Sequence, residues 1–324
     1  TAGRCESATS REVSVRACLF ALPEDVERFE PVLRRCCGAE ALLSPGRYLP
    51  ARRDSRVLVR DALRQRGWLP RERAERGFDR ILTTTRVAPS QVAAWLAPGG
   101  RVVLWHDPAV NSRWDLGIET RRAQPEIAAI VAPTPEALDG VHPEHATAVG
   151  DPLLDASFEP GAATRARAAL GTRGERPVVL VAIDSVPHPH WASSIAALRA
   201  EADVILLLAD PVALGDPANA WPRALTGPGL YAVGPAGPCR RADALALADL
   251  VVGADGAIVR GAALRGRRAL VLESAGRSRT RGSAAELPSV DAPGDLREAV
   301  GDALADRAPE ARTTDDAAGR LADV

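Results

Sequence analysis

The sequence predicts an α/β fold made of two doubly wound domains, and three observations support this. Short apolar runs alternate with helical patterns, as in parallel sheets whose strands are joined by helices. The alternation occurs twice, on either side of a stretch rich in Ala, Arg, Gly and Thr. The length of 324 residues is about twice that of a typical single domain. We therefore expect domains over 1–158 and 177–324, joined by a linker over 159–176 and facing each other across a ligand-binding cleft.

The first half of the chain alternates strand and helix patterns. The clearest helix pattern covers 23–37, where Val26, Phe29, Val32 and Leu33 fall on one stripe. A second predicted helix covers 89–96. The predicted strands are 13–21, 39–43, 78–83, 101–105, 127–132 and 146–150.

The same alternation resumes after the linker, which itself carries a short helical pattern over 162–170 stopped by Gly171. The predicted strands of this half are 177–183, 203–209, 229–233, 250–253 and 269–273. The predicted helices are 191–200, 241–248 and 257–265. Because the two halves share this order, the second domain is expected to repeat the architecture of the first.

The composition limits the class of protein. A hydrophobic content of 46% and a charged content of 26% are typical of globular domains, and the net charge of −1 gives no indication of a nucleic-acid partner. No apolar run approaches the roughly 18 residues of a membrane-spanning helix, so we expect a cytoplasmic protein, or one peripheral to the inner membrane face. The five cysteines are odd in number and lack metal-ligand spacing, which predicts free thiols and no metal site.

The segment 47–80 is unusually basic, with eleven arginines against five acids. Apolar residues such as Val57, Leu63 and Trp68 lie between the arginines, a pattern that suits a helix resting on an anionic membrane surface. The alternative is a solvated helix whose arginines form ion pairs. We favour this second interpretation, because most charge runs are solvent-exposed faces.

His106 is the first residue after the apolar run 101–105, which is closed by Asp107 and Pro108. In open α/β sheets, ligands bind beyond the carboxyl ends of the strands, so an imidazole at this place is aimed at a substrate. It can act there as a general base. The alternative is that His106 only caps its strand through a backbone hydrogen bond.

A second polar cluster follows the predicted strand 177–183. It contains His188 and His190, and Ser193 lies in the first turn of the next predicted helix. The two histidines can contact a diphosphate, and the serine can supply a hydroxyl. The alternatives are a polar loop stiffened by prolines, or a metal site, for which no acidic or cysteine partner stands at ligand spacing.

Several short segments, taken in order, resemble the CDP-glycerol glycerophosphotransferases of teichoic acid synthesis and related capsule polymerases. The matching segments are Trp105-His106, 130–136, 149–155, 248–252 and 268–272. The resemblance runs from about Val13 to Leu272. It implies a GT-B fold, in which the C-terminal domain holds a nucleotide-diphosphate donor and the N-terminal domain holds a polyol or sugar acceptor. The donor is a substrate, and no separate cofactor is implied.

The resemblance assigns a catalytic role to His106. The family has a histidine after a tryptophan and before a glycine, and that histidine is thought to be the base that acts on the acceptor hydroxyl. His106 matches it, while Asp107 stands where the family has glycine. A neighbouring carboxylate can orient the imidazole or raise its pKa.

The donor site departs from the family pattern. An Asp-Tyr-Ser-Ser run of the family corresponds to Ala254, Asp255, Gly256 and Ala257, so the hydroxyls that would hold donor phosphate are missing. Backbone N–H groups at the start of the helix at Ala257 can still bind a phosphate, because a helix N-terminus favours anions. A second family histidine before proline is replaced by Asp210.

Three kinds of function therefore remain. The first is a GT-B transferase that joins a glycerophosphate or glycosyl group from a nucleotide-diphosphate donor to a hydroxyl. The second is a UDP-sugar glycosyltransferase or a UDP-GlcNAc 2-epimerase-like enzyme. The third is a non-catalytic GT-B-like binding protein, favoured by the missing serines and opposed by the retained Trp105-His106. Residues 78–82 and 96–104 also resemble motifs of class I methyltransferases. We set this resemblance aside, because the first strand is not followed by the glycine-rich loop that binds the cofactor of those enzymes.

Overall fold

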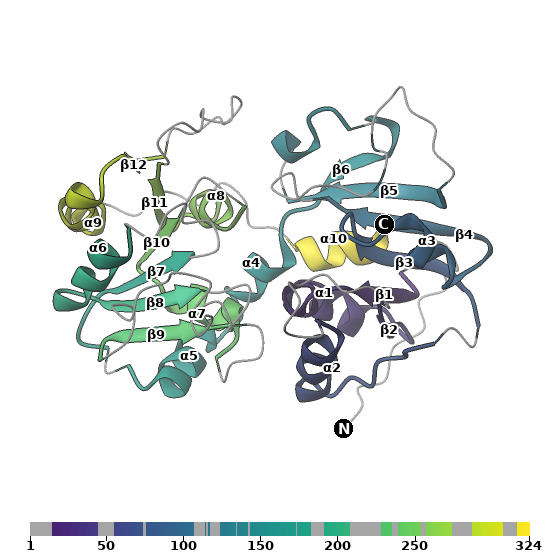
Figure 1. Ribbon diagram of the computed structural model, residues 1–324, viewed down its shortest axis with the longest axis horizontal. Coiled ribbons are helices and arrows are strands. Elements are labelled where there is room, and N and C mark those ends of the chain that lie inside the picture. Colours follow the sequence, from purple (N-terminus) through teal and green to yellow (C-terminus); the bar gives the residue numbers. More distant parts are fainter. Residues whose placement is uncertain are drawn as a thin grey trace. The chain divides into compact units, whose positions relative to one another are not determined.

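The computed structural model divides into two compact units. Unit 1 comprises 1–152 and 316–324, and unit 2 comprises 153–315. Each unit contains one six-stranded, all-parallel sheet with helices between the strands (Figure 1). The residues that the structure describes are 15–44, 55–73, 76–106, 114, 116, 124–133, 135–141, 143–172, 174–182, 191–207, 228–234, 239–253, 257–273, 287–306 and 316–324.

The sheet of unit 1 has the strand order β2-β1-β3-β4-β5-β6. Its strands are β1 (Ala17–Phe20), β2 (Glu40–Leu43), β3 (Phe78–Thr84), β4 (Leu96–Trp105), β5 (Glu126–Ala132) and β6 (Ala146–Ala148). Along β1, Cys18 and Phe20 enter one buried cluster, whereas Ala17 and Leu19 enter another. Both faces of the sheet are therefore covered, which explains why this strand is apolar throughout.

Helices pack on both faces of this sheet. They are α1 (Pro23–Arg35), α2 (Ser55–Gln65), α3 (Pro89–Ala93) and α10 (Ala317–Asp323), with 3₁₀ turns at Pro135–Leu138 and Pro143–His145. The predicted stripe of α1 is fully buried, together with Leu63 of α2 and Leu321 of α10. In Figure 1, α10 lies beside α1 although nearly the whole chain separates them.

The strand before His106 is longer than the sequence predicts. The Pro98-Gly99-Gly100 turn lies inside β4, and the predicted helix 89–96 ends at Ala93. Gly99 has a φ of +76°, and a Cβ on Gly100 would lie 2.7 Å from the Phe78 carbonyl oxygen. The two glycines thus form an irregularity, with Phe78 opposite Leu96 and Arg80 opposite Arg101.

The sheet of unit 2 has the order β12-β11-β10-β7-β8-β9. Its strands are β7 (Val178–Ala182), β8 (Asp203–Leu207), β9 (Leu230–Val233), β10 (Leu250–Gly253), β11 (Arg268–Leu272) and β12 (Ser289–Val290). Its helices are α4 (Pro152–Ala156, which begins in unit 1), α5 (Ala162–Leu170), α6 (Trp191–Ala197), α7 (Arg241–Leu247), α8 (Ala257–Leu264) and α9 (Leu296–Ala305), with 3₁₀ turns at Leu198–Ala200 and Pro293–Asp295.

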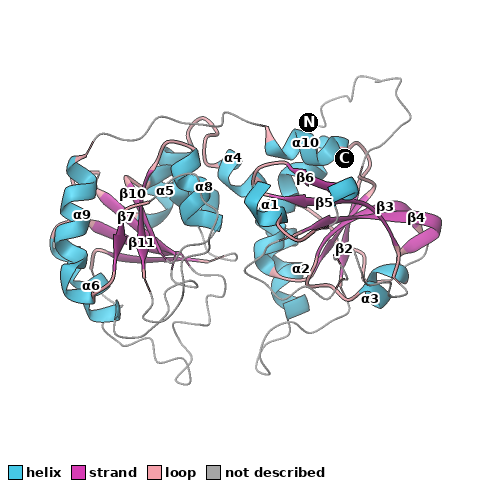
Figure 2. Ribbon diagram, turned by 90° about the horizontal axis from the view of Figure 1, so that it is seen from above, coloured by secondary structure: helices cyan, strands magenta, loops and turns pink. Residues whose placement is uncertain are grey.

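Two buried clusters sandwich this second sheet. Trp191 of α6 and Leu296 of α9 pack with Val179 and Val181 on one face. The other face is covered by α5, α7 and α8. Figure 2 shows α6 and α9 on one side of the sheet and α5 and α8 on the other. The two doubly wound α/β domains predicted from the sequence are thus present.

The boundary between the units differs from the predicted linker over 159–176. Residues 162–170 form α5, and Arg165 of that helix contacts Asp243 of α7 at 2.7 Å, so the segment belongs to unit 2. At the other end, Asp316 pairs with Arg35, and 316–324 returns to unit 1. Composition alone misled the prediction, since an Ala- and Arg-rich stretch also makes a short packed helix.

Ion pairs occupy much of the basic segment. Arg56 and Arg60 of α2 contact Glu72 at 3.4 and 2.7 Å, and Arg66 contacts the buried Glu27 at 2.8 Å. This favours the ion-paired interpretation, although Val57 is 44% exposed. Among the described residues, no helix has the length and apolar character to cross a bilayer.

Candidate functional site

His106 stands at the carboxyl edge of the sheet in unit 1. Its backbone N–H donates to the carbonyl oxygen of Val131 at 2.8 Å, which extends the pairing of β4 with β5 by one residue. Its side chain is half-buried. The placement is the one predicted, at the end of the sheet where open α/β folds bind ligands. Asp107, the predicted companion of His106, lies outside the described residues.

The residue before His106 is firmly packed. Trp105 is 2% exposed, and its ring lies 6.1 Å from the ring of Phe29 in an edge-on arrangement. The guanidinium of Arg28 lies over the indole at 5.1 Å and pairs with the buried Asp151 at 3.2 Å. These contacts hold the end of β4, and with it the backbone of His106, in place.

A small polar recess lies where β1, β3 and β4 end. It is lined by Glu24, Asp25, Arg28, Thr84, Thr85, Arg86 and Trp105. The Asp25 carboxylate stabilises the N-terminus of α1, because its Oδ2 accepts hydrogen bonds from the N–H groups of Ala21 and Leu22 at 3.1 and 2.9 Å. We call this group of residues the strand-end recess.

Burial dominates the electrostatics of this recess. The pKa of Asp25 is raised from 3.8 to about 6, first by burial and then by the neighbouring Glu24, against the lowering effects of Arg86, the Leu22 N–H and Arg28. The sequence-based prediction considered this turn only for its missing glycines and overlooked Asp25. An acid in the first turn of a helix that begins with Pro23 was the available signal.

In unit 2, the strand order brings the two predicted donor segments to one edge. β7 and β10 are neighbours, and the chain runs outward in opposite directions from this pair, so the topological switch point lies between them. The predicted donor residues follow these two strands. Ser193 lies exposed in α6, and Ala257 begins α8. His188, His190, Asp255 and Gly256 lie outside the described residues.

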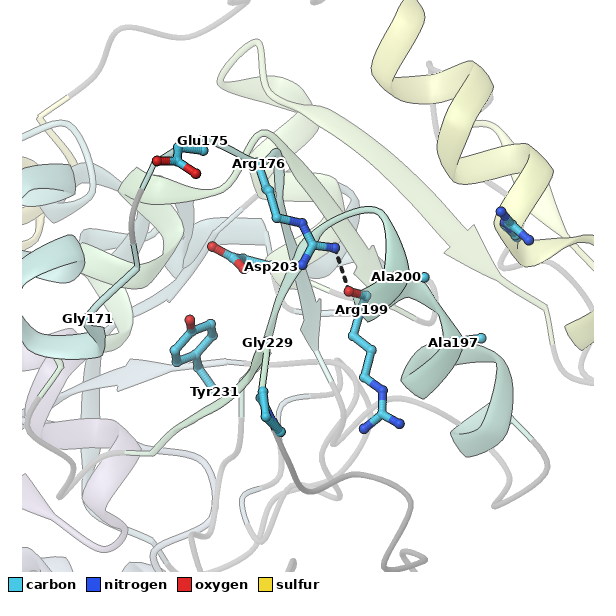
Figure 3. Close-up of a pocket in the computed structure, with 11 residues that line it drawn as sticks. Gly171, Glu175, Arg176, Ala197, Arg199, Ala200, Asp203, Gly229 and Tyr231 are labelled. Atoms are coloured by element: carbon cyan, nitrogen blue, oxygen red, sulfur yellow. Dashed lines mark hydrogen bonds between the residues drawn. The ribbon is translucent and has the colours of Figure 1, made fainter.

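A wider, open recess of about 1010 Å³ lies at the opposite edge of the same sheet (Figure 3). It is bounded by Asp203, the first residue of β8, and by Gly229, which precedes β9. Arg176 lies beside Asp203 and donates to the carbonyl oxygen of Arg199. Because ligands of doubly wound sheets bind at the carboxyl edge, we do not assign the donor to this recess.

No protein-family model and no curated protein sequence matches the chain. Solved structures do resemble it. The wall teichoic acid polymerase TagF aligns with a TM-score of 0.54 at 10% identity, over 95% of this chain and 87% of that one. The UDP-GlcNAc 2-epimerase of Methanocaldococcus jannaschii, solved with UDP-GlcNAc and UDP, gives 0.53 at 11% identity, over 94% and 97%.

A glycosyltransferase from Rickettsia africae also aligns, with a TM-score of 0.50 at 10% identity over 96% of this chain and 92% of that one. The chain has the GT-B fold. At such low identities the likeness establishes the architecture and leaves the reaction open. Among the described residues, no group of three or more His, Cys, Asp or Glu side chains is placed to hold a metal ion.

Proposed function

We propose that the protein is a transferase that moves a glycerophosphate or glycosyl group from a nucleotide-diphosphate donor to a hydroxyl of a polyol or sugar acceptor. The fold, shared with a teichoic acid polymerase and a glycosyltransferase, supports this class of reaction. The observation that carries the proposal is the position of His106, directly after the buried Trp105 at the carboxyl edge of unit 1. CDP-glycerol and nucleotide sugars are the donors to test first.

The proposed chemistry needs one base and one anion site. The neutral imidazole of His106 takes the proton of the acceptor hydroxyl as that oxygen attacks the β-phosphorus of CDP-glycerol. The bond from this phosphorus to the bridging oxygen breaks, and CMP leaves with the electron pair. With a nucleotide-sugar donor, the same oxygen attacks the anomeric carbon and the nucleoside diphosphate leaves. Asp107 orients the imidazole in either case.

The donor phosphates are assigned to the switch point of unit 2. The proposed phosphate ligands are N–H groups in the first turn of α8, which begins at Ala257 after β10, because a helix N-terminus favours anions. Gly256, which precedes this helix in the sequence, carries no side chain that would obstruct a phosphate. Asp255 stands beside it in the sequence and suits a ribose or glycerol hydroxyl. His188 and His190 follow the neighbouring strand β7 and contact the diphosphate, and Ser193 adds a hydroxyl.

Substitution of His106 tests the base directly. His106→Ala should lower kcat by roughly 10²- to 10⁴-fold and leave donor affinity nearly unchanged, because the imidazole acts on the acceptor oxygen. His106→Gln should be no more active, since an amide can hydrogen-bond but cannot take the proton. The measurement is nucleotide release from CDP-glycerol and UDP-sugars with a polyol or sugar acceptor present.

His145→Ala is the matched control, because His145 lies exposed in a 3₁₀ turn away from the strand end. It should retain full activity. A melting curve on each variant separates lost chemistry from lost folding. Full turnover by a folded His106→Ala protein would end the catalytic assignment. No turnover by the wild type, combined with nucleotide-dependent stabilisation, would indicate the non-catalytic binding protein instead.

An epimerase-like reaction is the second candidate. It is favoured by the likeness to the Methanocaldococcus jannaschii UDP-GlcNAc 2-epimerase, of which 97% is covered at a TM-score of 0.53. The two reactions differ in their need for an acceptor. Incubation with UDP-GlcNAc alone, followed by NMR of the sugar, should show inversion at C2 for an epimerase and unchanged configuration for a transferase.

A further inference from the structure

Two residues that line the strand-end recess each carry a buried polar atom without a hydrogen-bond partner among the described residues. These atoms are Oγ1 of Thr84, the last residue of β3, and Nε1 of Trp105, the last residue of β4. Both residues are more than nine-tenths buried, at 4% and 2% exposure. Native proteins pair nearly all buried polar atoms, so two such atoms in residues that line one recess suit a polar ligand.

The position of the recess agrees with a ligand site. The strand order β2-β1-β3-β4 reverses direction at β1, so the switch point of this sheet lies between β1 and β3. Thr84 ends β3 there, and Asp25 lies in the first turn of the helix that follows β1. Ligands of doubly wound sheets bind in this crevice, and His106 follows Trp105 directly in the chain.

The donors and acceptors of the recess select the kind of ligand. The Trp105 N–H can only donate, so the ligand atom must accept; the Thr84 hydroxyl can do either, and the carboxylates of Glu24 and Asp25 accept. A cation would leave the indole N–H unpaired, and an anion would meet two carboxylates. A hydroxyl group accepts and donates at once.

The charge and the size of the recess also favour a hydroxyl group over an anion. The guanidinium of Arg28 is paired with Asp151, and that of Arg86 with Glu24, so little positive charge remains to attract an anion. The space within the recess is about that of one water-sized group. The hydroxyl at the end of a polyol is of this size, whereas a phosphate or a sugar ring is larger.

We propose that the strand-end recess binds a terminal hydroxyl of a polyol, with Trp105 Nε1–H donating to the hydroxyl oxygen and Thr84 Oγ1 pairing with it. If the protein is the transferase proposed above, this polyol is the acceptor, and the recess is a specificity subsite beside the base His106. The binding itself does not depend on that reaction.

Glycerol is the probe, and the indole N–H of Trp105 is the reporter. In ¹⁵N-labelled protein this resonance is assigned by its loss in Trp105→Phe. We expect a saturable shift of the Trp105 signal as glycerol is added, while the other tryptophan indoles serve as internal controls. Inorganic phosphate and ammonium chloride at matched ionic strength should not reproduce the shift.

Two neighbouring threonines provide matched variants. Thr84→Val should weaken glycerol binding by roughly 3- to 10-fold, because it removes one hydrogen bond to the ligand. It should leave the melting temperature nearly unchanged, since this hydroxyl lacks a partner among the described residues. Thr83→Val should lower the melting temperature, because its hydroxyl donates to the Leu19 carbonyl at 3.1 Å, and should leave glycerol binding unchanged.

Each outcome decides the proposal. A Trp105 signal that does not shift saturably with glycerol would mean that the recess holds only water, and would overturn it. A shift with phosphate instead, or equal glycerol affinity in both threonine variants, would overturn it as well. If glycerol binds as expected but no donor is turned over, the hydroxyl site stands and the proposed transferase fails. If turnover is found and the Trp105 signal does not respond to glycerol, the proposed transferase stands and the hydroxyl site fails.

Discussion

At the scale of single residues, burial of Asp25 makes stability depend on pH. The native pKa of about 6 lies above the unfolded value of 3.8, so the folded protein binds more protons between these values. The free energy of unfolding therefore falls as the pH rises from about 4 to about 6, by about 3 kcal/mol in total at 1.36 kcal/mol per unit. Urea unfolding across this range measures the effect.

Asp25→Asn should remove this contribution, because the amide oxygen can still accept the N–H groups of Ala21 and Leu22 without ionising. The variant should gain stability over the wild type above about pH 6 and show a flatter profile. Asp79→Asn, at an exposed position of β3, is the control and should follow the wild type. Parallel profiles for wild type and Asp25→Asn would contradict the assignment.

At the scale of elements, the strands were the most predictable part of the fold. Runs such as 250–253 are apolar because both faces of each sheet are covered, and the structure confirms that strand. The helices α9 and α10 were not predicted. Much of their order comes from contacts with distant parts of the chain, such as Asp316 with Arg35, which no local pattern reveals.

Long-range contacts also limited how much of the candidate functional site could be predicted from the sequence. His106 could be placed from its own strand, whereas the strand-end recess required the pairing of β1 with β3, which brings Asp25 near Thr84 across more than fifty residues. A parallel register of this kind is set by tertiary packing and is not written in either segment alone. The predicted donor residues flank β7 and β10, and their assignment stays a prediction.

A glycine contact in unit 2 allows a test at the same scale. A Cβ on Gly261 of α8 would lie 2.0 Å from Cδ1 of the buried Leu154, so α8 and α4 approach closely only because this side chain is missing. Gly261→Ala should therefore lower the free energy of unfolding by about 1–3 kcal/mol through overpacking, despite the better helix propensity of alanine. Chemical denaturation gives the value.

Gly301 of α9 is the matched control, because a Cβ there meets nothing within 4 Å. Gly301→Ala should stabilise the protein, by up to about 1 kcal/mol, through helix propensity alone. The two substitutions are chemically identical, so opposite signs isolate the contact with Leu154. Stabilisation by both would show that Leu154 moves aside without cost.

At the scale of the whole molecule, the chain leaves unit 1 at residue 152 and returns to it at residue 316, so each unit depends on a different part of the sequence. Leu321 of α10 is fully buried in the same core cluster of unit 1 as Phe29, whereas Leu296 of α9 is fully buried in unit 2. Truncation of a buried leucine to alanine typically costs about 2–5 kcal/mol. The loss of stability should be confined to the unit whose core contains the truncated side chain.

Hydrogen exchange resolves the two units within one protein. Leu321→Ala should speed exchange in β1 and β4 and leave β7 and β10 nearly unchanged, although it lies at the far end of the chain from β1. Leu296→Ala should show the reverse pattern. If both variants accelerated exchange equally in the two sheets, the units would unfold as one, and the returning helix α10 would couple them instead of belonging to unit 1 alone.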